Sequence, residues 1–319
     1  MSNRSYPWGH SKPFNDYATY IKQRFSERVQ KISVDAGFTC PNRDGTVASG
    51  GCTYCDNDTF KPFYCSSKKS VTQQLNEGID FFAKKYKSQN YSAYFQSFSN
   101  TYAPLEHLKR LYSEALNVEG VTGLVIGTRP DCIDEAKLDY LQQLAENHYI
   151  VLEYGLESCH NDTLRKINRG HSFEESVKAL DRSKNRGFDV GVHLIMGLPG
   201  EPRELLLEEA DILSELPFDM LKLHQLQIVK RTPMAKDYSR HPENFQLFST
   251  ADEYINFLVS FINRLNPEIK IERFVSQSPP DMLIAPNWGG LKNFEFVHKL
   301  LKALKDTDSF QGKYYMSSV

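Results

Sequence analysis

The sequence predicts an α/β fold in which helices cover a parallel β-sheet, and three observations support this. Short runs rich in β-forming residues alternate about six times with stretches that show the helical spacing of apolar residues. Hydrophobic residues make up 40% of the 319 residues and charged residues 24%, which is typical of a globular chain. Neither a low-complexity stretch nor a short sequence repeat interrupts the pattern. The alternation favours a barrel or an open doubly wound sheet, and periodicity does not distinguish the two.

The expected elements follow one another along the chain. Strands are expected at 31–35, 91–98, 121–128, 149–155, 188–196 and 220–229. Helices are expected at about 70–87, 105–117, 135–147, 173–186, 203–215 and 252–265. In the helix at 173–186, Ser172 and Glu175 form the pattern of a capping box, and Gly187 supplies the stop. Ligands of such folds bind where the strands end, so the residues just after each strand are the candidates for a site.

Charge and the N-terminal residues limit the class of protein. The formal charge of −2 excludes a strongly basic nucleic-acid-binding protein, although it is compatible with local basic patches. No apolar run approaches the roughly 20 residues needed to span a bilayer. Residues 1–10 lack the apolar core of a signal peptide. We therefore expect a soluble, cytoplasmic protein that does not associate with membranes.

Three of the six cysteines cluster directly after the first expected strand, with the spacing Cys40-x11-Cys52-x2-Cys55. Soft thiolates select zinc or iron–sulfur clusters. A structural zinc site needs four ligands, and neither Cys65 nor His10 completes a common zinc spacing. Three thiolates suit a cubane cluster with one open iron, and zinc remains the alternative. The other cysteines are interpreted as small buried residues: Cys65, Cys132 and Cys159.

Several segments in a fixed order resemble the radical S-adenosylmethionine (SAM) superfamily. The pair Cys52-x-Tyr54-Cys55 matches the cluster signature of that family. The other matching segments are 128–131 (TRPD), 155–158 (GLES), 168–171 (NRGH) and 193–201 (HLIMGLPGE). The resemblance extends from about Trp8 to the region of Trp288. It is strongest to the branch that contains the elongator catalytic subunit and the bacterial YhcC/YtqA-type proteins.

The resemblance implies a partial (βα)6 TIM-like barrel at 31–275, with an N-terminal extension at 1–30 and a C-terminal extension at 276–319. It also implies a [4Fe–4S] cluster on Cys40, Cys52 and Cys55, with SAM on the open iron. Such enzymes cleave SAM reductively and produce a 5′-deoxyadenosyl radical, which the protein positions and shields. The electron comes from a low-potential donor of the flavodoxin or ferredoxin type.

The resemblance also implies contacts to SAM. Arg169 corresponds to a basic position that pairs with the SAM carboxylate, and arginine suits that geometry. The usual Gly-Gly-Glu after the second strand is missing, so serine and asparagine candidates take its place. The complete set is Tyr54, Ser97, Ser99, Asn100, Glu157, Arg169, His193 and Gly197. A helix cap at Glu157, a surface ion pair at Arg169 and a simple loop requirement at Gly197 are the alternatives.

Candidate substrate contacts lie on two other strands. Lys222 and His224 alternate with leucines on the sixth strand, and Arg129 and Asp131 follow the third. Buried ion pairs are the alternative interpretation of these four residues. Three basic clusters could bind the phosphates of a folded RNA, with solvated charged faces as the alternative. They comprise Lys22, Arg24, Arg28 and Lys31; Lys61, Lys68, Lys69, Lys84, Lys85 and Lys87; and Lys292, His298, Lys299, Lys302 and Lys305. The resemblance to enzymes that act on the wobble uridine of tRNA implies tRNA as the substrate, with the wobble uridine side chain as the target. A radical SAM enzyme acting on a small molecule such as a tetrapyrrole, and a zinc-stabilised binding module, remain as alternatives.

Overall fold

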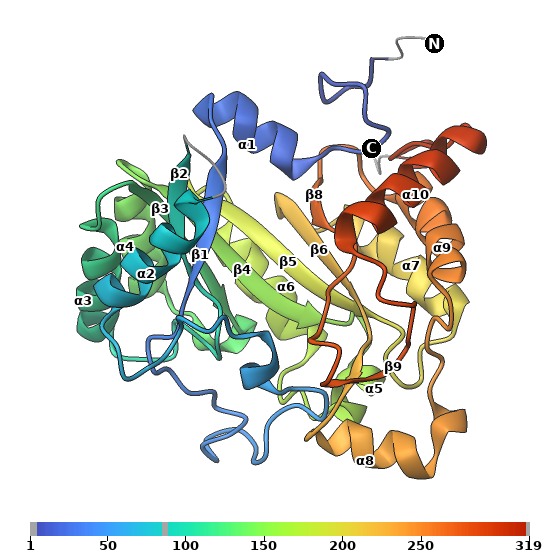
Figure 1. Cartoon of the computed structure of the whole chain (residues 1–319), viewed down its shortest axis with the longest axis horizontal. Coiled ribbons are helices and arrows are strands. Elements are labelled where there is room, and N and C mark those ends of the chain that lie inside the picture. The colour runs from blue at the N-terminus through green and yellow to red at the C-terminus, as the bar shows by residue number, and fades with distance from the viewer. Residues whose placement is uncertain (1–4, 85–88, 317–319) are drawn as a thin grey trace.

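Seven parallel strands form one curled sheet in the computed structural model, which describes residues 5–84 and 89–316. Their spatial order equals their order along the chain, and every neighbouring pair is parallel. The strands are β1 (Val29–Val34), β2 (Asn90–Phe95), β3 (Val121–Thr128), β4 (Tyr149–Glu157), β5 (Asp189–Met196), β6 (Met220–Gln225) and β8 (Lys270–Arg273). A doubly wound sheet reverses its strand order at a switch point. This sheet does not, so the partial barrel is confirmed and the open alternative is wrong (Figure 1).

Helices cover the outer face of the sheet (Figure 1). They are α2 (Val71–Ala83), α3 (Leu105–Leu116), α4 (Glu135–Ala145), α6 (Phe173–Ser183), α7 (Arg203–Ser214) and α9 (Ala251–Arg264). The short helix α5 (Asn161–Lys166) lies instead at the carboxyl ends of the strands. The capping box of α6 is present, with Ser172 N donating to Glu175 Oε2 at 2.7 Å. Helix α6 ends at Ser183, four residues before Gly187, because Lys184 already adopts an extended conformation.

The expected strand at 220–229 is two strands. β6 ends at Gln225, and β7 (Ile228–Val229) pairs antiparallel with β9 (Leu283–Ala285). The chain between β7 and β9 contains α8 (Pro233–Arg240) as well as α9 and β8. After β9, α10 (Asn293–Asp306) packs on α9. The C-terminal extension is therefore joined to the barrel through a small second sheet.

Helix α1 (Tyr17–Phe25) covers the amino ends of the strands, where Figure 1 shows it crossing the barrel. Tyr17 and Ile21 pack into a cluster with Tyr149 and Met220 from the inner face of the sheet. The hydroxyl groups of Tyr17 and Tyr149 are 3.3 Å apart, and Tyr149 donates to Asp189 at 2.6 Å. These contacts close part of this end of the lumen, beside a cavity of about 610 Å³ that Tyr17, Lys31 and Tyr149 line. None of the helices in the described residues combines the length and apolarity needed to cross a membrane.

Candidate functional site

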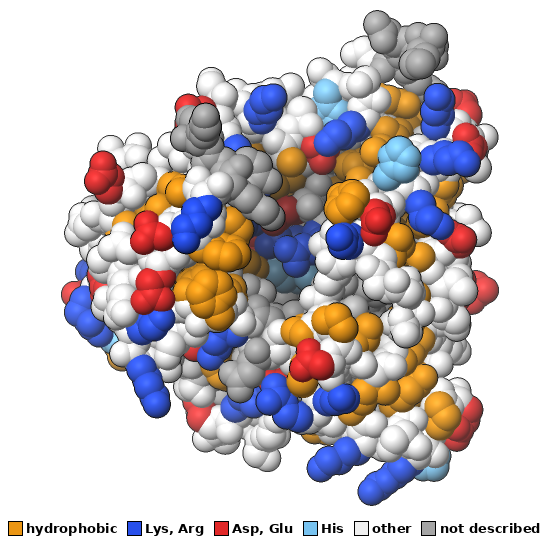
Figure 2. Space-filling view, in the orientation of Figure 1, with side chains coloured by type: hydrophobic (Ala, Val, Ile, Leu, Met, Phe, Trp, Pro, Cys, Tyr) orange, Lys and Arg blue, Asp and Glu red, His pale blue; other side chains and the backbone are white. Residues whose placement is uncertain are grey.

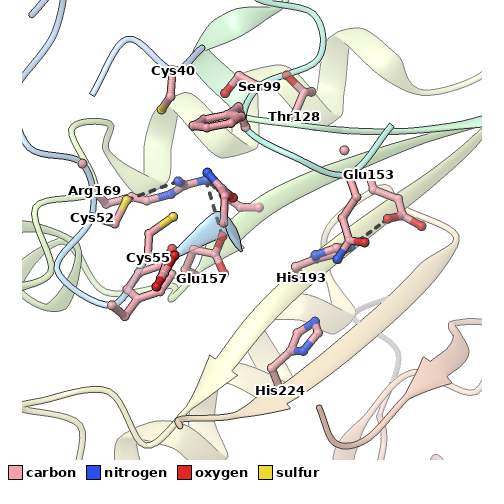
Figure 3. Close-up of a pocket in the computed structure, with 18 of the residues that line it drawn as sticks. Cys40, Cys52, Cys55, Ser99, Thr128, Glu153, Glu157, Arg169, His193 and His224 are labelled. Carbon is pink, nitrogen blue, oxygen red and sulfur yellow. Dashed lines mark hydrogen bonds and ion pairs between the residues drawn. The ribbon is translucent and has the colours of Figure 1, made fainter. Parts of the chain in front are cut away.

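A cavity of about 230 Å³ opens at the carboxyl ends of the strands, and the cysteine loop forms one end of it. Cys40, Cys52 and Cys55 all line the cavity as free thiols. The loop is held by its own backbone, since Arg43 N donates to Cys40 O at 2.8 Å and Cys55 N to Cys52 O at 3.1 Å. Figure 3 shows the three thiols at the same end of the cavity. Folding therefore brings together the three residues that the spacing singled out.

Two neighbouring helices anchor the cysteine pair. Thr53 N donates to Ile167 O just after α5, and Thr53 O accepts from Met234 N at the start of α8, both at 2.9 Å. The side chain of Tyr54 lines the cavity and packs on the apolar cluster beneath these helices. Burial, with nearby Cys52 and Glu157, raises the pKa of Tyr54 well above its ordinary value. Tyr54 therefore remains a neutral phenol beside the thiols.

Arg169 is buried beside the cysteine pair. Its Nη1 donates to Cys52 Sγ at 3.6 Å, and its Nη2 lies 3.5 Å from Glu157 Oε1 and donates to Gly155 O. Its Nε has no hydrogen-bond partner among the described residues. Glu157 also lines the cavity, and its positive φ of 72° turns the chain at the end of β4. Arg169 is thus an internal cation at the site and not a surface ion pair.

The candidates after β2 separate in the structure. Ser99 lines the cavity, and its buried Oγ has no hydrogen-bond partner among the described residues. Ser97 instead lines a separate cavity of about 70 Å³. The Asn100 side chain donates to Phe95 O and Gly127 O, which ties β2 to β3. Phe98 causes this separation, because its φ of 67° redirects the chain.

Three other candidates lie behind the cavity wall. Gly197 approaches the 246–248 segment, with Gln246 O 3.4 Å from where a Cβ would stand. Arg129 forms a two-point ion pair with Asp131 at 2.8 and 2.7 Å and also donates to Arg169 O at 2.6 Å. Neither Arg129 nor Asp131 is among the described residues that line the cavity. The ion-pair interpretation fits them, and Arg129 braces the backbone of Arg169.

The opposite end of the cavity, here called the inner end, is polar and charged. It is lined by Tyr94, Glu153, His193, Lys222, His224 and Arg273. Glu153 is fully buried and accepts from Lys222 at 2.6 Å, Lys31 at 3.0 Å and His193 at 3.0 Å. Lys222 and His224 face the lumen, as the alternation on their strand predicted. His193 lies at this inner end with them (Figure 3).

Sequence reasoning missed Glu153 and Arg273. Glu153 is a carboxylate inside the largely apolar strand β4, two residues before Gly155 and four before Glu157. Side chains two apart on a strand share a face, so the prediction for Glu157 already implied that Glu153 faces the lumen. Arg273 carried no such signal, because the short strand that holds it was not expected.

The donors at the cysteine end fit a [4Fe–4S] cluster with SAM. Unpaired buried donors are costly, and the carboxylate and amino groups of SAM are suitable partners for Arg169 Nε and Ser99 Oγ. Across residues 5–84 and 89–316, no three His, Cys, Asp or Glu side chains converge as ligands of one metal ion. A cubane cluster takes each thiolate on a different iron.

Comparison with known proteins agrees with this donor set. Residues 42–213 match the radical SAM superfamily model, and residues 218–306 match the radical SAM C-terminal domain. Bacillus subtilis YtqA is 33% identical over 316 residues, which cover 99% of this chain and 97% of YtqA. Escherichia coli YhcC is 34% identical over 279 residues, covering 87% of this chain and 88% of YhcC.

A solved structure shares the fold. Elp3 of the archaeon Methanocaldococcus infernus superposes with a TM-score of 0.64 at 16% identity, over 89% of this chain and 64% of that one. At this identity the likeness concerns the fold. Membership of the radical SAM family establishes a [4Fe–4S] cluster and SAM as the cofactors and excludes the zinc alternative. The chain belongs to the radical SAM superfamily.

Proposed function

We propose that this radical SAM enzyme modifies tRNA at the side chain of the wobble uridine. A relative whose name states this substrate supports the proposal. The tRNA uridine(34) acetyltransferase of Methanocaldococcus infernus is 27% identical over 153 residues, which cover 47% of this chain and 28% of that protein. The observation that carries the proposal is the form of the cavity, whose small interior opens beside a basic surface.

The cysteine end of the cavity would hold the cofactors, and the inner end would hold the substrate. When bound, the cluster and SAM supply a 5′-deoxyadenosyl radical after one-electron reduction by a partner protein, for which we propose a flavodoxin or ferredoxin type. Cys40, Cys52 and Cys55 hold the cluster, and Arg169 and Ser99 offer unpaired donors to SAM. The inner end is left for the reacting group of the substrate. Side chains from β2, β4, β5, β6 and β8 line this end, and such a lined lumen limits side reactions of a radical.

The cavity opens to the surface, which favours a substrate that inserts one group from outside. The cluster and SAM would occupy its cysteine end, so only the inner end is left for the inserted group. A nucleobase turned out of an RNA strand needs room for the base alone, while the rest of the RNA stays on the surface.

Basic residues border the cysteine end of the cavity. The segment from β7 through α8 carries Lys230, Arg231, Lys236 and Arg240. Arg231 pairs with Asp56 at 2.9 Å, whereas the other three are exposed and have no ion pair within the described residues. Figure 2 shows Lys and Arg side chains along this lower edge of the molecule. Such unpaired cations suit RNA phosphates.

The three basic clusters that the sequence suggested offer fewer unpaired cations to RNA than this segment does. Lys31 points into the lumen, and three other lysines are paired with carboxylates. These pairs are Lys61–Asp35 at 2.6 Å, Lys69–Glu77 at 2.5 Å and Lys299–Asp252 at 3.0 Å. Lys85 and Lys87 lie outside the described residues. We therefore place the RNA-binding surface on the border formed by residues 230–240.

Nucleoside analysis of tRNA from a deletion strain tests the proposal. We expect one modified wobble uridine to disappear and its precursor to accumulate. Wild-type protein and a Cys132→Ala variant should restore it, because Cys132 is a buried thiol outside the cavity lining. Cys52→Ala should not restore it. An unchanged nucleoside profile, with SAM cleavage intact in the purified enzyme, would contradict the tRNA assignment and favour a small-molecule substrate.

A further inference from the structure

His193 and Glu153 form a hydrogen-bonded pair at the inner end of the cavity. They lie on the adjacent strands β5 and β4, and His193 Nε2 is 3.0 Å from Glu153 Oε2 (Figure 3). Both side chains line the cavity. Because regular strands carry both residues, their relative position is set by the sheet and not by a loop.

Glu153 is held as a carboxylate. Burial acts to raise its pKa, but Lys222 at 2.6 Å and Lys31 at 3.0 Å hold the pKa of Glu153 well below its usual range. Both lysines also contact Glu272, so the buried cluster contains two cations and two anions. An ionised carboxylate only accepts hydrogen bonds. Nε2 of His193 must therefore carry the hydrogen, and the neutral ring has its lone pair on Nδ1.

Nδ1 of His193 is left available. No hydrogen bond to it is formed within the described residues, and 19% of the side chain remains exposed. Glu153 from β4 and His224 from β6 contact the ring. The other titratable groups near it at this end of the lumen are Lys222 from β6, Arg273 and Glu272 from β8, Lys31 from β1 and Tyr94 from β2. Burial, together with His193, Arg273 and Lys222, holds the pKa of His224 well below its ordinary value. His224 is thus a neutral neighbour, with ring centroids 5.6 Å apart.

We propose that Nδ1 of His193 accepts a proton from an N–H or O–H group of the substrate, with Glu153 as the positioning residue. The substrate N–H or O–H bond breaks, and its electron pair stays on the substrate heteroatom. A new N–H bond forms on Nδ1, and the Glu153 carboxylate stabilises the resulting imidazolium. No redox equivalent is consumed in this step. The inference deepens the proposed function by assigning the acid–base chemistry of the substrate end, and its kinetic test rests on tRNA as the substrate.

The tautomer is tested first, without substrate. Full-length protein labelled with 15N-histidine gives one set of ring nitrogen resonances per histidine, and His193→Gln identifies the set of His193. We expect the neutral ring to carry its hydrogen on Nε2, with Nδ1 unprotonated. Protonation of Nδ1 in the neutral ring would overturn the proposal. Glutamine still offers an amide donor toward Glu153, so this variant retains the buried contact.

The kinetic test uses reconstituted enzyme and tRNA from the deletion strain. In His193→Gln we expect kcat for tRNA modification to fall about 100-fold or more, as for loss of a general base, with little change in KM. A single general base makes kcat rise with pH, and this rise should be absent in His193→Gln. His148→Gln is the matched control, because His148 is half-buried just before β4, at the opposite end of the barrel.

Two further outcomes are decisive. Glu153→Gln should shift the pH dependence of kcat, whereas a purely structural role would change stability without moving it. A His193→Gln enzyme with wild-type kcat and pH profile would overturn the proposal. If the wild-type enzyme leaves this tRNA unchanged, the proposed function fails, and the ring nitrogen measurement still decides the state of His193.

Discussion

Two pairs of buried carboxyl groups lie on opposite sides of the barrel wall, and their surroundings differ in one respect. Glu153 and Glu272, inside the lumen, share the cations of Lys31 and Lys222. Glu201 and Glu209, on the helix side, have no lysine or arginine within ion-pair distance among the described residues. In the described part of the chain, the one basic side chain within 4 Å of either carboxyl group is His160, whose Nε2 lies 3.9 Å from Glu209 Oε1.

The second pair is stabilised by neutral donors. Ser158 Oγ donates to Glu201, and Cys159 N donates to Glu209 at 2.8 Å. One oxygen of each carboxyl group has no partner in the described part of the chain. Burial raises the pKa of Glu201 to about 7, and burial together with the charge of Glu201 raises the pKa of Glu209 well above its ordinary value.

The comparison teaches that burial alone does not decide the charge of a carboxyl group. Cations within about 3 Å outweigh desolvation in the lumen and keep Glu153 ionised, so that it can orient His193. Without them the same burial raises the pKa values of Glu201 and Glu209. The lumen pair, Glu153 and Glu272, is therefore held ionised, whereas the outer pair, Glu201 and Glu209, has raised pKa values.

The largest expected effect comes from removing a cation from the lumen. Lys222→Met leaves two carboxylates to share Lys31, and an uncompensated buried charge costs about 3–5 kcal/mol of unfolding free energy. Urea unfolding of the apo-protein at pH 7 measures this loss. Lys178→Met, at an exposed position on α6, should change stability by less than about 0.5 kcal/mol. Adding Glu272→Gln to Lys222→Met should restore part of the loss, and a single variant as stable as the control would contradict the comparison.

That lumen cluster also marks the limit of what the sequence predicts. Alternating apolar patterns gave the order of strands and helices, and the spacing of Cys40, Cys52 and Cys55 gave the metal site. The contacts of Glu153 to Lys31 and Lys222 join residues 122 and 69 positions apart. No local period connects such residues, because the closure of the sheet creates the contact.

Short and irregular elements were the other failures. Strand β8 has four residues, of which only Ile271 is fully buried, so it lacks the alternation that identifies a strand. The break after Gln225 depends on pairing with β9, a segment more than 50 residues away. Ser97 and Asn100 do not line the cavity, although they were predicted to contact SAM. The positive φ at Phe98 turns the chain there, and such a φ is unusual for an aromatic residue and has no sequence signal.

The raised pKa of Glu201 should appear as a pH dependence of the free energy of unfolding. The folded pKa of Glu201, about 7, exceeds its ordinary value of 4.5, so the folded state binds this proton more tightly. The protonated Glu201 contributes its full share of the free energy of unfolding below pH 4.5, and this contribution is lost as pH rises toward and through 7. Its size is roughly 3 kcal/mol, at 1.36 kcal/mol per pKa unit. Urea midpoints between pH 4.5 and 8 should fall in the wild-type protein and fall less in Glu201→Gln, while equal slopes in the two proteins would show that Glu201 is already ionised.

The smallest expected effect tests the neutral donors. Ser158→Ala removes the hydroxyl that donates to Glu201 and accepts from His160 N at 3.0 Å, which should cost about 1–2 kcal/mol of unfolding free energy. The Ser158 hydrogen bond also lowers the pKa of Glu201 against the effect of burial. Its loss should therefore move the pH-dependent fall in stability to higher pH. Ser239→Ala, exposed on α8, is the control for the same measurement. If the pH dependence stays in place while stability falls, then desolvation alone sets the proton affinity of Glu201, and the contrast between the two pairs rests entirely on the lysines of the lumen.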